Sequence, residues 1–255
     1  MHGGRSKGAM NPAPRHGLAR VLSKQGVCSR REAAAWIQAG RVAVDGRTVR
    51  DPEFPVVLGR QQVSVDGRAI GEVARVYLML NKPRGLVTTA SDERGRETVY
   101  RCFQGAGLPW LGPVGRLDKA SEGLLLFCND PQWAAGITDP LHGLDKTYHV
   151  QVDAIPDAAM LAALVAGVDQ DGEPLRAVSA TLLRAGEKNA WLEIVLDEGR
   201  NRQIRRLLAA FGMDVMRLVR VAIGPLAMGG LAKGAWRELS PAEVEALTTS
   251  GSCGD

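Results

Sequence analysis

One aspartate in this chain lies in a setting that favours chemistry. Asp118 belongs to the sequence Gly-Arg-Leu-Asp-Lys-Ala-Ser-Glu-Gly, which runs directly into an apolar segment at residues 124–127. The glycines permit positive φ or a close backbone approach, and the apolar segment predicts a buried strand or helix turn that anchors the loop. An acid held in this way is a candidate nucleophile or general base. The simpler interpretation is that Asp118 only caps a turn.

Arginines lie near this aspartate and recur later in the chain. Arg116 precedes Asp118 by two residues on the same extended segment. At residues 200–211 an apolar stripe predicts a docked helix with arginines near its N-terminal half. Those arginines are Arg200, Arg202, Arg205 and Arg206. A carboxylate beside an arginine stays ionised, as a nucleophile must, whereas a general acid would need an apolar site.

A tyrosine on an alternating segment is the third candidate. Residues 146–152 alternate as a strand, with Tyr148, Val150 and Val152 on one face and Lys146 in line with them. Taken singly, Tyr148 is typical of a core residue and Arg205 of a solvated helix face.

Strands outnumber helices in the region that must position these side chains. We predict strands at 76–81, resumed at 86–89, and at 146–152, 177–183, 190–196 and 215–223, with helices at 131–137, 156–165 and from 240 onward. The Lys-Pro-Arg-Gly loop at 82–85 fits either a phosphate site or a bare turn. This order favours an α+β fold with a mixed, mainly antiparallel sheet and flanking helices.

A smaller unit precedes this region. A helix begins near Leu18 and ends at Gly26, and Ser29 with Glu32 forms a capping box that begins a second helix, which ends at Gly40. A hairpin with an Asp-Gly turn follows at 41–49, and a further strand at 63–65 ends in a second Asp-Gly turn. The arginines of this unit predict a basic surface: Arg30, Arg31, Arg41, Arg47 and Arg68. A solvated helix face is the simpler interpretation of the first two.

A specific pattern accompanies these elements. Residues 26–46 match G-x-x-S-R-R-E-A…I-x-x-G-x-V-x-V-x-G. This pattern resembles the ribosomal-protein-S-four-type RNA-binding domain, and the resemblance implies that Arg30, Arg31, Arg41 and Arg47 bind RNA. We therefore predict a small helical and β RNA-binding module.

Length and composition set the domain organisation. The chain has 255 residues, 45% of them hydrophobic, a formal net charge of +4 and a pI near 9.0. We predict a disordered basic arm at 1–16, an RNA-binding domain at 17–72, a catalytic domain at 76–247 and a disordered tail at 248–255. The clustering of arginine favours nucleic acid as the partner.

Cysteine and histidine spacing argues against a metal site. The four cysteines are far apart with no C-x-x-C pair, and the four histidines show no i, i+4 pairing. No signal peptide and no apolar run of about 18 residues is found. We expect a monomeric cytoplasmic protein with no metal and no contact with membranes.

The motifs occur in a recognisable order. GRLD…SEGLLLF, then K-T-Y, then E-G-R-N-R-Q-I-R-R, after an S-four-type module, closely resembles the RsuA/RluB-type family of ribosomal RNA pseudouridine synthases. The resemblance spans about residues 17–247. It implies isomerisation of one uridine in ribosomal RNA, a reaction that gains and loses no atoms and needs no cofactor. The absence of a P-loop or a G-x-G-x-x-G motif agrees with this.

The resemblance also implies roles for single residues. Asp118 matches the catalytic aspartate, Tyr148 the tyrosine that stacks on the base, and Arg205 the basic residue paired with the aspartate. Arg116 matches the arginine that fills the space of the flipped uridine. Lys146, Arg200 and Arg202 are further candidates for substrate binding.

Several alternatives stay open at this point. A non-catalytic ribosome-assembly factor would use the domain only as a scaffold, and a carboxylate glycosidase would need a second acid, for which Glu122 is the local candidate. We favour large-subunit over small-subunit RNA. The target uridine, the point of attack on sugar or base, and the substrate, free RNA or an assembling subunit, are not determined by the sequence.

Overall fold

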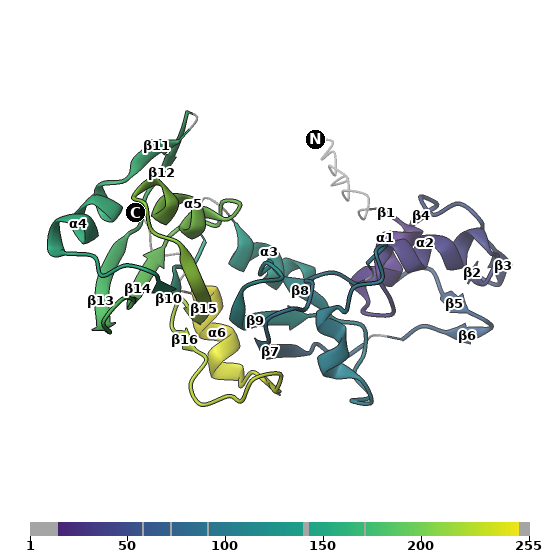
Figure 1. Cartoon of the computed structure of the whole chain (residues 1–255). Helices are drawn as coiled ribbons and strands as arrows, with labels where there is room; N and C mark the ends of the chain where they lie inside the picture. The colour runs from purple at the N-terminus through teal and green to yellow at the C-terminus, as the bar shows by residue number, and fades with distance from the viewer. Residues whose placement is uncertain are drawn as a thin grey trace, which may run out of the picture. The chain divides into compact units, whose positions relative to one another are not determined.

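The structure, a computed structural model, describes residues 15–57, 59–71, 73–90, 92–139, 143–170 and 172–249. Contacts divide the chain into two compact units, Met1–Ala74 and Arg75–Asp255. Within the described residues, no helix is both long and apolar enough to cross a membrane. Figure 1 labels the elements of both units, which are described separately below.

The first unit packs two helices against a small antiparallel sheet. Its elements are β1 (His16–Gly17), α1 (Leu18–Lys24), α2 (Arg30–Gln38), β2 (Val42–Val44), β3 (Arg47–Thr48), β4 (Pro55–Val56), β5 (Val63–Val65) and β6 (Arg68–Ala69). The sheet order is β3-β2-β5-β6, and β1 pairs with β4. Apolar side chains of both helices and the strands form one core.

The predicted caps and turns of this unit are confirmed. Ser29 Oγ accepts a hydrogen bond from the Glu32 amide at 3.1 Å, which caps α2. Asp45 and Asp66 both have φ of 50°, and each is followed by a glycine with positive φ. Two successive positive φ values match the type I′ turn that Asp-Gly favours between antiparallel strands.

The ends of the chain differ from the prediction where they are described. His16 was expected to end a disordered arm, but it lies in β1 and pairs with Val56 of β4. The arm prediction was wrong at this residue because the backbone of residues 16–17 completes a short ladder with β4; residues 1–14 lie outside the described residues. At the other end, α6 continues through Thr249, so the predicted tail begins two residues too early.

The second unit is built on one large sheet. Its elements are β7 (Tyr77–Lys82), the 3₁₀ helix η1 (Val99–Phe103), β8 (Gly112–Val114), β9 (Glu122–Cys128), α3 (Pro131–Thr138), β10 (Lys146–Val152), α4 (Ala158–Ala166), β11 (Val168–Gln170), β12 (Glu173–Leu175), β13 (Ser179–Ala185), β14 (Ala190–Leu196), α5 (Gln203–Ala210), β15 (Val215–Ile223), β16 (Leu226–Ala227), β17 (Trp236–Glu238) and α6 (Pro241–Thr249). The main order is β13-β14-β10-β15-β9-β7-β17.

This sheet is mixed and mainly antiparallel, as predicted. The β9–β15 pair is parallel, with Val219 opposite Glu122 and Arg220 opposite Gly123. β11 and β12 form a separate hairpin that projects beside α5 (Figure 1). The α+β fold is confirmed, and its sheet contains a parallel strand pair. This pair, called the β9–β15 seam below, joins a strand before α3 to a strand after it.

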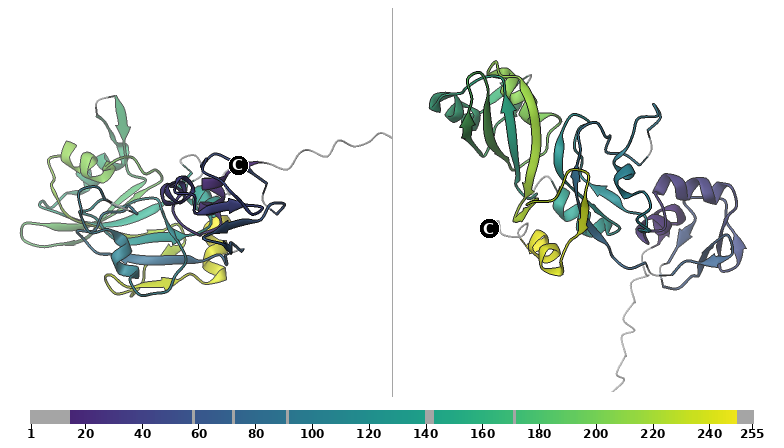
Figure 2. Two further views of the ribbon diagram at one scale, coloured as in Figure 1. Left: turned by 90° about the vertical axis from the view of Figure 1, so that its right-hand side faces the viewer. Right: turned by 60° about the horizontal axis from the view of Figure 1, so that its bottom comes forward.

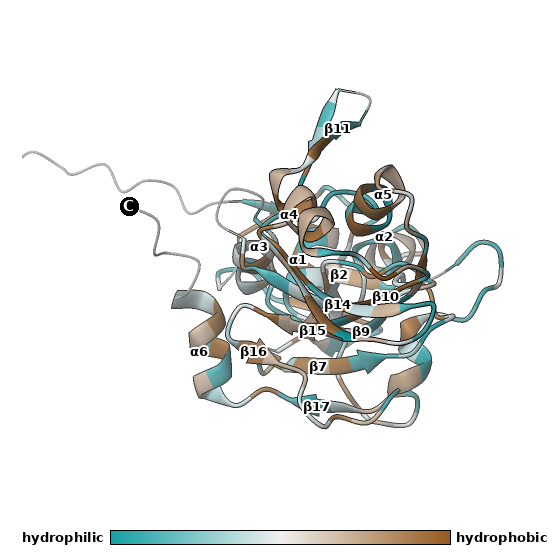
Figure 3. Ribbon diagram, turned by 60° about the vertical axis from the view of Figure 1, so that its left-hand side comes forward, coloured by the Kyte–Doolittle hydropathy of each residue, from teal (hydrophilic) through white to brown (hydrophobic). Residues whose placement is uncertain are grey.

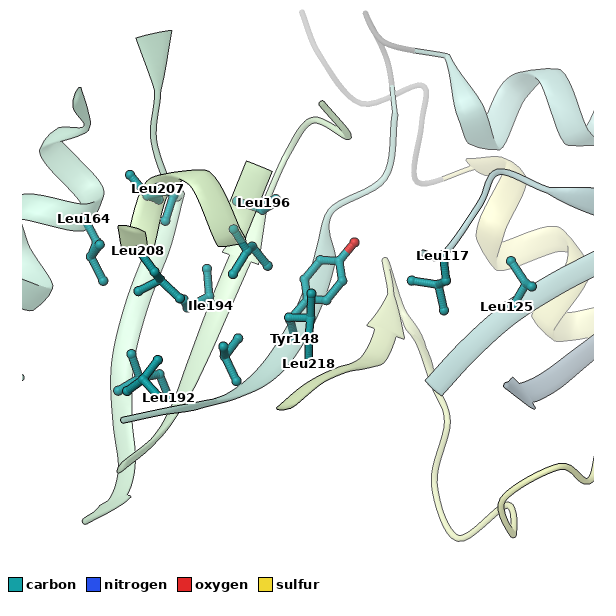
Figure 4. Packing of buried hydrophobic residues seen from close by; sticks show 14 of the residues in the cluster. Leu117, Leu125, Tyr148, Leu164, Leu192, Ile194, Leu196, Leu207, Leu208 and Leu218 are labelled. Atoms are coloured by element: carbon teal, nitrogen blue, oxygen red, sulfur yellow. The ribbon is translucent and has the colours of Figure 1, made fainter. Parts of the chain in front are cut away.

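Two apolar cores cover different faces of the sheet. One joins α4, α5 and η1 to the strands, and its leucines surround Tyr148 (Figure 4). Figure 3 shows α4 and α5 on the same side of β14 and β10. The other core lies between β7, β9, α3 and α6. α6 lies beside β16, as Figures 2 and 3 show.

One predicted strand is wrong. Residues 86–89 were expected to resume a strand, but they form only a single bridge between Val87 and Thr98. The reason is that this segment serves the neighbouring loop: the Thr88 hydroxyl donates to the Leu117 carbonyl at 2.7 Å. The prediction also missed five short strands and η1, since each has too few residues to show a period.

Gly123 permits the close approach of β9 and β15. It has φ of +100°, and a Cβ added there would lie 2.2 Å from the Arg220 carbonyl oxygen. We expect Gly123→Ala to lower the free energy of unfolding by about 2–4 kcal/mol, because it combines left-handed strain with a backbone clash. Urea unfolding measures this change. Gly136→Ala is the matched control, since Gly136 has open space around its Cβ position and should be neutral or mildly stabilising. Equal effects at both glycines would contradict this account.

Candidate active site

A cavity of about 650 Å³ opens in the second unit. Its walls come from the loop before β9, the first residues of β10, the segment between β14 and α5, and the end of β15. All seven residues predicted for chemistry or substrate binding in this unit line it. They are Arg116, Asp118, Lys146, Tyr148, Arg200, Arg202 and Arg205. The fold therefore gathers residues that are up to 89 positions apart in sequence, since 205 − 116 = 89.

A buried lysine organises the loop that carries Asp118. Lys82 is fully buried, and its Nζ donates to the carbonyl oxygens of Ser121 at 2.8 Å, Pro83 at 3.1 Å and Asp118 at 3.2 Å. The Gly85 amide donates to the Lys119 carbonyl at 2.7 Å. The sequence fits either a phosphate site or a bare turn at residues 82–85. Because Lys82 points inward and donates to backbone carbonyls, this loop holds the segment that carries Asp118.

The charge state of Lys82 makes this arrangement sensitive to pH. Burial lowers the pKa of Lys82 to about 8 from an ordinary value of 10.5, although the carboxylates of Glu122 and Asp118 oppose the shift. Between these two values the unfolded chain holds more protons than the folded one, so stability should rise with pH across this window. Below pH 8 the buried charge costs stability in full.

We therefore expect the free energy of unfolding of the wild type, relative to Lys82→Met, to increase by up to about 3 kcal/mol from pH 8 to 10.5. Urea unfolding of both proteins at several pH values measures the difference. Lys188→Met removes an exposed lysine and should follow the wild type at every pH. A difference that stays constant with pH would show that Lys82 does not titrate in this window.

The Asp118 carboxylate faces arginines. Its Oδ2 lies 3.9 Å from Nη1 of Arg202, and the two side chains are 41% and 52% exposed. Arg205 had been expected to pair with Asp118. In the described residues, Arg205 makes no ion pair within 4 Å; its Nη1 donates to the Val215 carbonyl at 3.1 Å. Among the described residues, the cation within 4 Å of the Asp118 carboxylate is thus Arg202, and the expected pair with Arg205 is not formed.

Arg205 is nevertheless held beside the aspartate. Burial and the neighbouring Arg202 lower the pKa of the Arg205 guanidinium, while the charge of Asp118 opposes that shift. Its Nε is buried and, within the described part of the chain, has no hydrogen-bond partner. A buried guanidinium with an unsatisfied N–H still has hydrogen-bonding capacity for a ligand in the cavity.

The other arginines of this segment are engaged differently. Arg200 Nε donates to Glu198 at 2.7 Å, and its Nη1 donates to the Pro174 carbonyl at 2.8 Å and lies 3.4 Å from Glu173. Arg206 also binds Glu173, so the β11–β12 hairpin is tied to α5. Arg116 is exposed at the cavity. The acidic neighbours of Arg200 reduce the positive charge that it offers to a substrate.

Tyr148 forms an apolar wall of the cavity. The residue is 9% exposed and lies among leucines of β14, β15 and α5, with Leu117 on the other side (Figure 4). Its hydroxyl points away from the leucines of β14 and α5. The ring is therefore fixed by packing. Tyr148 is thus a core residue that also lines the cavity, and its stacking on a base stays a prediction.

Glu122 is unsuited to be a second catalytic acid. Its side chain is 4% exposed and pairs with Arg217 and Lys233. Burial acts to raise the pKa of Glu122, but hydrogen bonds from these two cations hold it below its ordinary value. An acid that stays ionised and pairs with two cations cannot protonate a leaving group, which argues against the glycosidase alternative.

Sequence reasoning missed two polar residues near the cavity, Lys82 as a support and Arg220 as a wall residue. Arg220 is 6% exposed and in phase with buried Leu218 on β15. That phase is the signal that could have identified it, since a strand arginine in register with core residues needs a buried partner or a ligand.

In the first unit, two of the four predicted RNA-binding arginines are ion-paired. Arg30 lies 3.1 Å from Glu53, and Arg41 binds both carboxylate oxygens of Asp66. Arg47 lies exposed on β3. Arg31 is also exposed, at the start of α2.

Comparison with known proteins places this geometry in a family. The RNA pseudouridylate synthase model matches residues 76–210, and the S4 domain model matches residues 17–61. The chain is 36% identical over 233 residues to ribosomal large subunit pseudouridine synthase B of Bacillus subtilis, covering 90% of this chain and 94% of that protein. The chain belongs to the RNA pseudouridylate synthase family.

Other relatives agree with this membership. An uncharacterised RNA pseudouridine synthase of Rickettsia prowazekii is 38% identical over 224 residues, which cover 88% of this chain and 94% of that protein. A crystal structure of a pseudouridylate synthase superposes with a TM-score of 0.62 at 30% identity, covering 91% of this chain and 99% of that chain. The predicted family and fold are confirmed, and the chain is an RNA-modifying isomerase with an S4 domain.

Proposed function

We propose that this synthase converts one uridine of ribosomal RNA to pseudouridine, and that the RNA is that of the large subunit. The assignment to the large subunit is supported by the name of the Bacillus subtilis relative. The observation that carries the reaction is that Asp118, Tyr148 and Arg205 line a single cavity in a chain of this family.

In this proposal, each residue of the cavity has a separate role in the reaction. Asp118 is the nucleophile, and the Lys82 contacts to backbone carbonyls fix its loop. Tyr148 stacks on the flipped uracil, and Arg116 fills the gap left in the RNA, which offsets the few kcal/mol, roughly, that base flipping costs. Arg205 and Arg202 orient the carboxylate, and the remaining basic residues hold the RNA backbone. The carboxylate attacks the sugar or the ring, or acts first as a base at the ribose.

The two units take different parts in this proposal. A domain at 17–72 binds RNA through Arg30, Arg31, Arg41 and Arg47, and a domain at 76–247 carries out the reaction. The protein acts as a monomer in the cytoplasm, on free RNA or on an assembling subunit.

Carbodiimide-dependent reverse-transcription mapping of both ribosomal RNAs tests this function. RNA from cells with and without this gene is compared, because carbodiimide adducts of pseudouridine stop the reverse transcriptase. We expect one stop in large-subunit RNA to disappear with the gene. A lost stop in small-subunit RNA would reassign the substrate, and identical profiles would favour the non-catalytic scaffold.

Arg30 and Arg31 provide a separate test of the first unit. The double change to Gln should weaken RNA binding and reduce the slope of log K against log salt by about 1–2, since each phosphate contact contributes close to one. Fluorescence anisotropy at several salt concentrations measures the slope. Arg50→Gln is the control, because its Nη1 is used by the Gln38 carbonyl at 2.9 Å. An unchanged slope in the double variant would remove these arginines from the interface.

A further inference from the structure

Arg220 has more hydrogen-bonding capacity than its surroundings use. It is 6% exposed and lines the cavity. Its Nε donates to the Leu124 carbonyl at 2.8 Å, which ties β15 to β9. Its Nη2 is buried and has no hydrogen-bond partner among the residues that the structure describes. A structural role for Arg220 explains the hydrogen bond of Nε but not the buried Nη2. Buried polar groups without a partner are rare in folded proteins, so Nη2 is available to a ligand in the cavity.

A second cation lies close to it. Lys146 also lines the cavity, and in the described part of the chain its Nζ makes no ion pair within 4 Å. Burial and then the charge of Arg220 lower the pKa of Lys146, while Asp145 and Asp197 oppose that shift. Two like charges held together in a half-buried cavity repel each other, and an anion bound between them would relieve that repulsion more directly than Asp145 and Asp197, neither of which lies within 4 Å of the Lys146 ammonium in the described residues.

The register places both cations beside the predicted base-stacking residue. Arg220 lies directly opposite Tyr148 in the β10–β15 ladder. Lys146 precedes Tyr148 by two residues on the same strand, so both side chains point to the same face. An anion between the cations would therefore lie next to a uracil stacked on Tyr148.

We propose that Lys146 and Arg220 form a phosphodiester-binding subsite that holds the RNA backbone next to the flipped uridine. This proposal rests on the proposed function and adds a residue, Arg220, to the substrate contacts. Phosphate is the matching group because it is anionic and presents several acceptor oxygens, whereas the uracil carbonyls are neutral. A planar guanidinium and a flexible ammonium bind such a group together through charge-assisted hydrogen bonds.

Binding of small ligands to the full-length protein tests the subsite directly. The ligands are uridine, the methyl phosphodiesters of uridine at the 5′ and 3′ positions, and inorganic phosphate, and the readout is chemical-shift titration. We expect one diester to bind at least about tenfold more tightly than uridine, the gain of a charge-assisted contact. The position of the preferred diester identifies which phosphate is held.

Three variants distinguish binding at the subsite from a general electrostatic attraction between the protein and the diester. In Lys146→Gln and Arg220→Gln the preference for the diester should fall to within about twofold, while uridine itself binds as before. Arg184→Gln removes a cation that stacks on Trp191 and does not line the cavity, so it should keep the preference. Thermal melting identifies an Arg220 variant that fails to fold, and Lys146→Gln then carries the test.

Two results would overturn the proposal. One is equal affinity for uridine and both diesters in the wild type, or a preference that survives Lys146→Gln. The other is inorganic phosphate binding as tightly as the diesters, which would make this a general anion site. If no ribosomal pseudouridine depends on the gene but the preference is lost in Lys146→Gln, the subsite stands and the proposed function fails.

Discussion

Asp118→Asn should abolish pseudouridine formation and leave folding and RNA affinity unchanged. Asparagine has the shape of aspartate but no nucleophilic carboxylate, so the rate should fall by at least about 10⁴-fold. Stability should change by less than about 0.5 kcal/mol, because the side chain is 41% exposed and its nearest cation is 3.9 Å away. Release of tritium from RNA labelled at C5 of uridine measures the rate, since bonding at C5 displaces that hydrogen.

Glu193→Gln is the matched control for this change. Glu193 pairs with His149 at 3.2 Å and does not line the cavity. Loss of its charge should leave the rate within about twofold, as expected of a substitution outside the site. If Asp118→Asn retained activity, the proposed nucleophile would be wrong; if both variants lost activity, the loss would not be specific to the cavity.

Arg205→Met should reduce the single-turnover rate by about 10²–10³-fold, the usual effect of removing one preorganised electrostatic contact. Methionine keeps an apolar stem at this position of α5 and removes the guanidinium, whose Nη1 donates to the Val215 carbonyl. Arg202→Met should cost less than about tenfold, and its effect should shrink at high salt, because an exposed pair is screened by ions.

Single-turnover rates for both variants at low and high salt decide between these arginines. Of the two arginines, Arg202 is the one within 4 Å of the Asp118 carboxylate, so distance alone would predict the larger loss for Arg202→Met. Arg205 is less exposed than Arg202, and a less exposed charge is screened less by ions, so burial predicts the larger loss of rate for Arg205→Met. A larger, salt-independent loss in Arg202→Met would assign the orienting role to Arg202 and leave Arg205 as a support of β15.

Local rules predicted much of the fold. The bounds of β10, β14 and β15 match the prediction because their alternating apolar residues each face a core. Ser29 and the two Asp-Gly turns were predictable because capping and positive φ are determined by neighbouring residues. The parallel β9–β15 seam was not predictable, since it joins residues that are 97 positions apart, as 219 − 122 = 97.

The sequence predicted which residues line the candidate site better than it predicted which of them contact one another. All seven residues that the motifs identified line the cavity, but neither motif nor period indicates which arginine lies nearest to the Asp118 carboxylate. Lys82 was missed as a support because a lysine at a strand end is normally solvated, and two of the three carbonyls that it binds, those of Asp118 and Ser121, come from a distant loop. Arg220 was missed because its partner carbonyl lies on β9.

The seam between β9 and β15 has a consequence for cooperativity. Asp118 comes from the half of the sheet that contains β7 and β9, whereas Tyr148 and Arg205 come from the half built on β10, β14 and α5. Two register pairs, the contact of Arg220 with Leu124 and the pairing of Arg217 with Glu122 join these halves. A partial unfolding that opens this seam would separate Asp118 from Tyr148 and Arg205. Because both apolar cores contain side chains from β7 or β9 and from β15, such an opening would also disrupt core packing on both faces of the sheet. The geometry of the site is therefore coupled to the stability of the whole sheet.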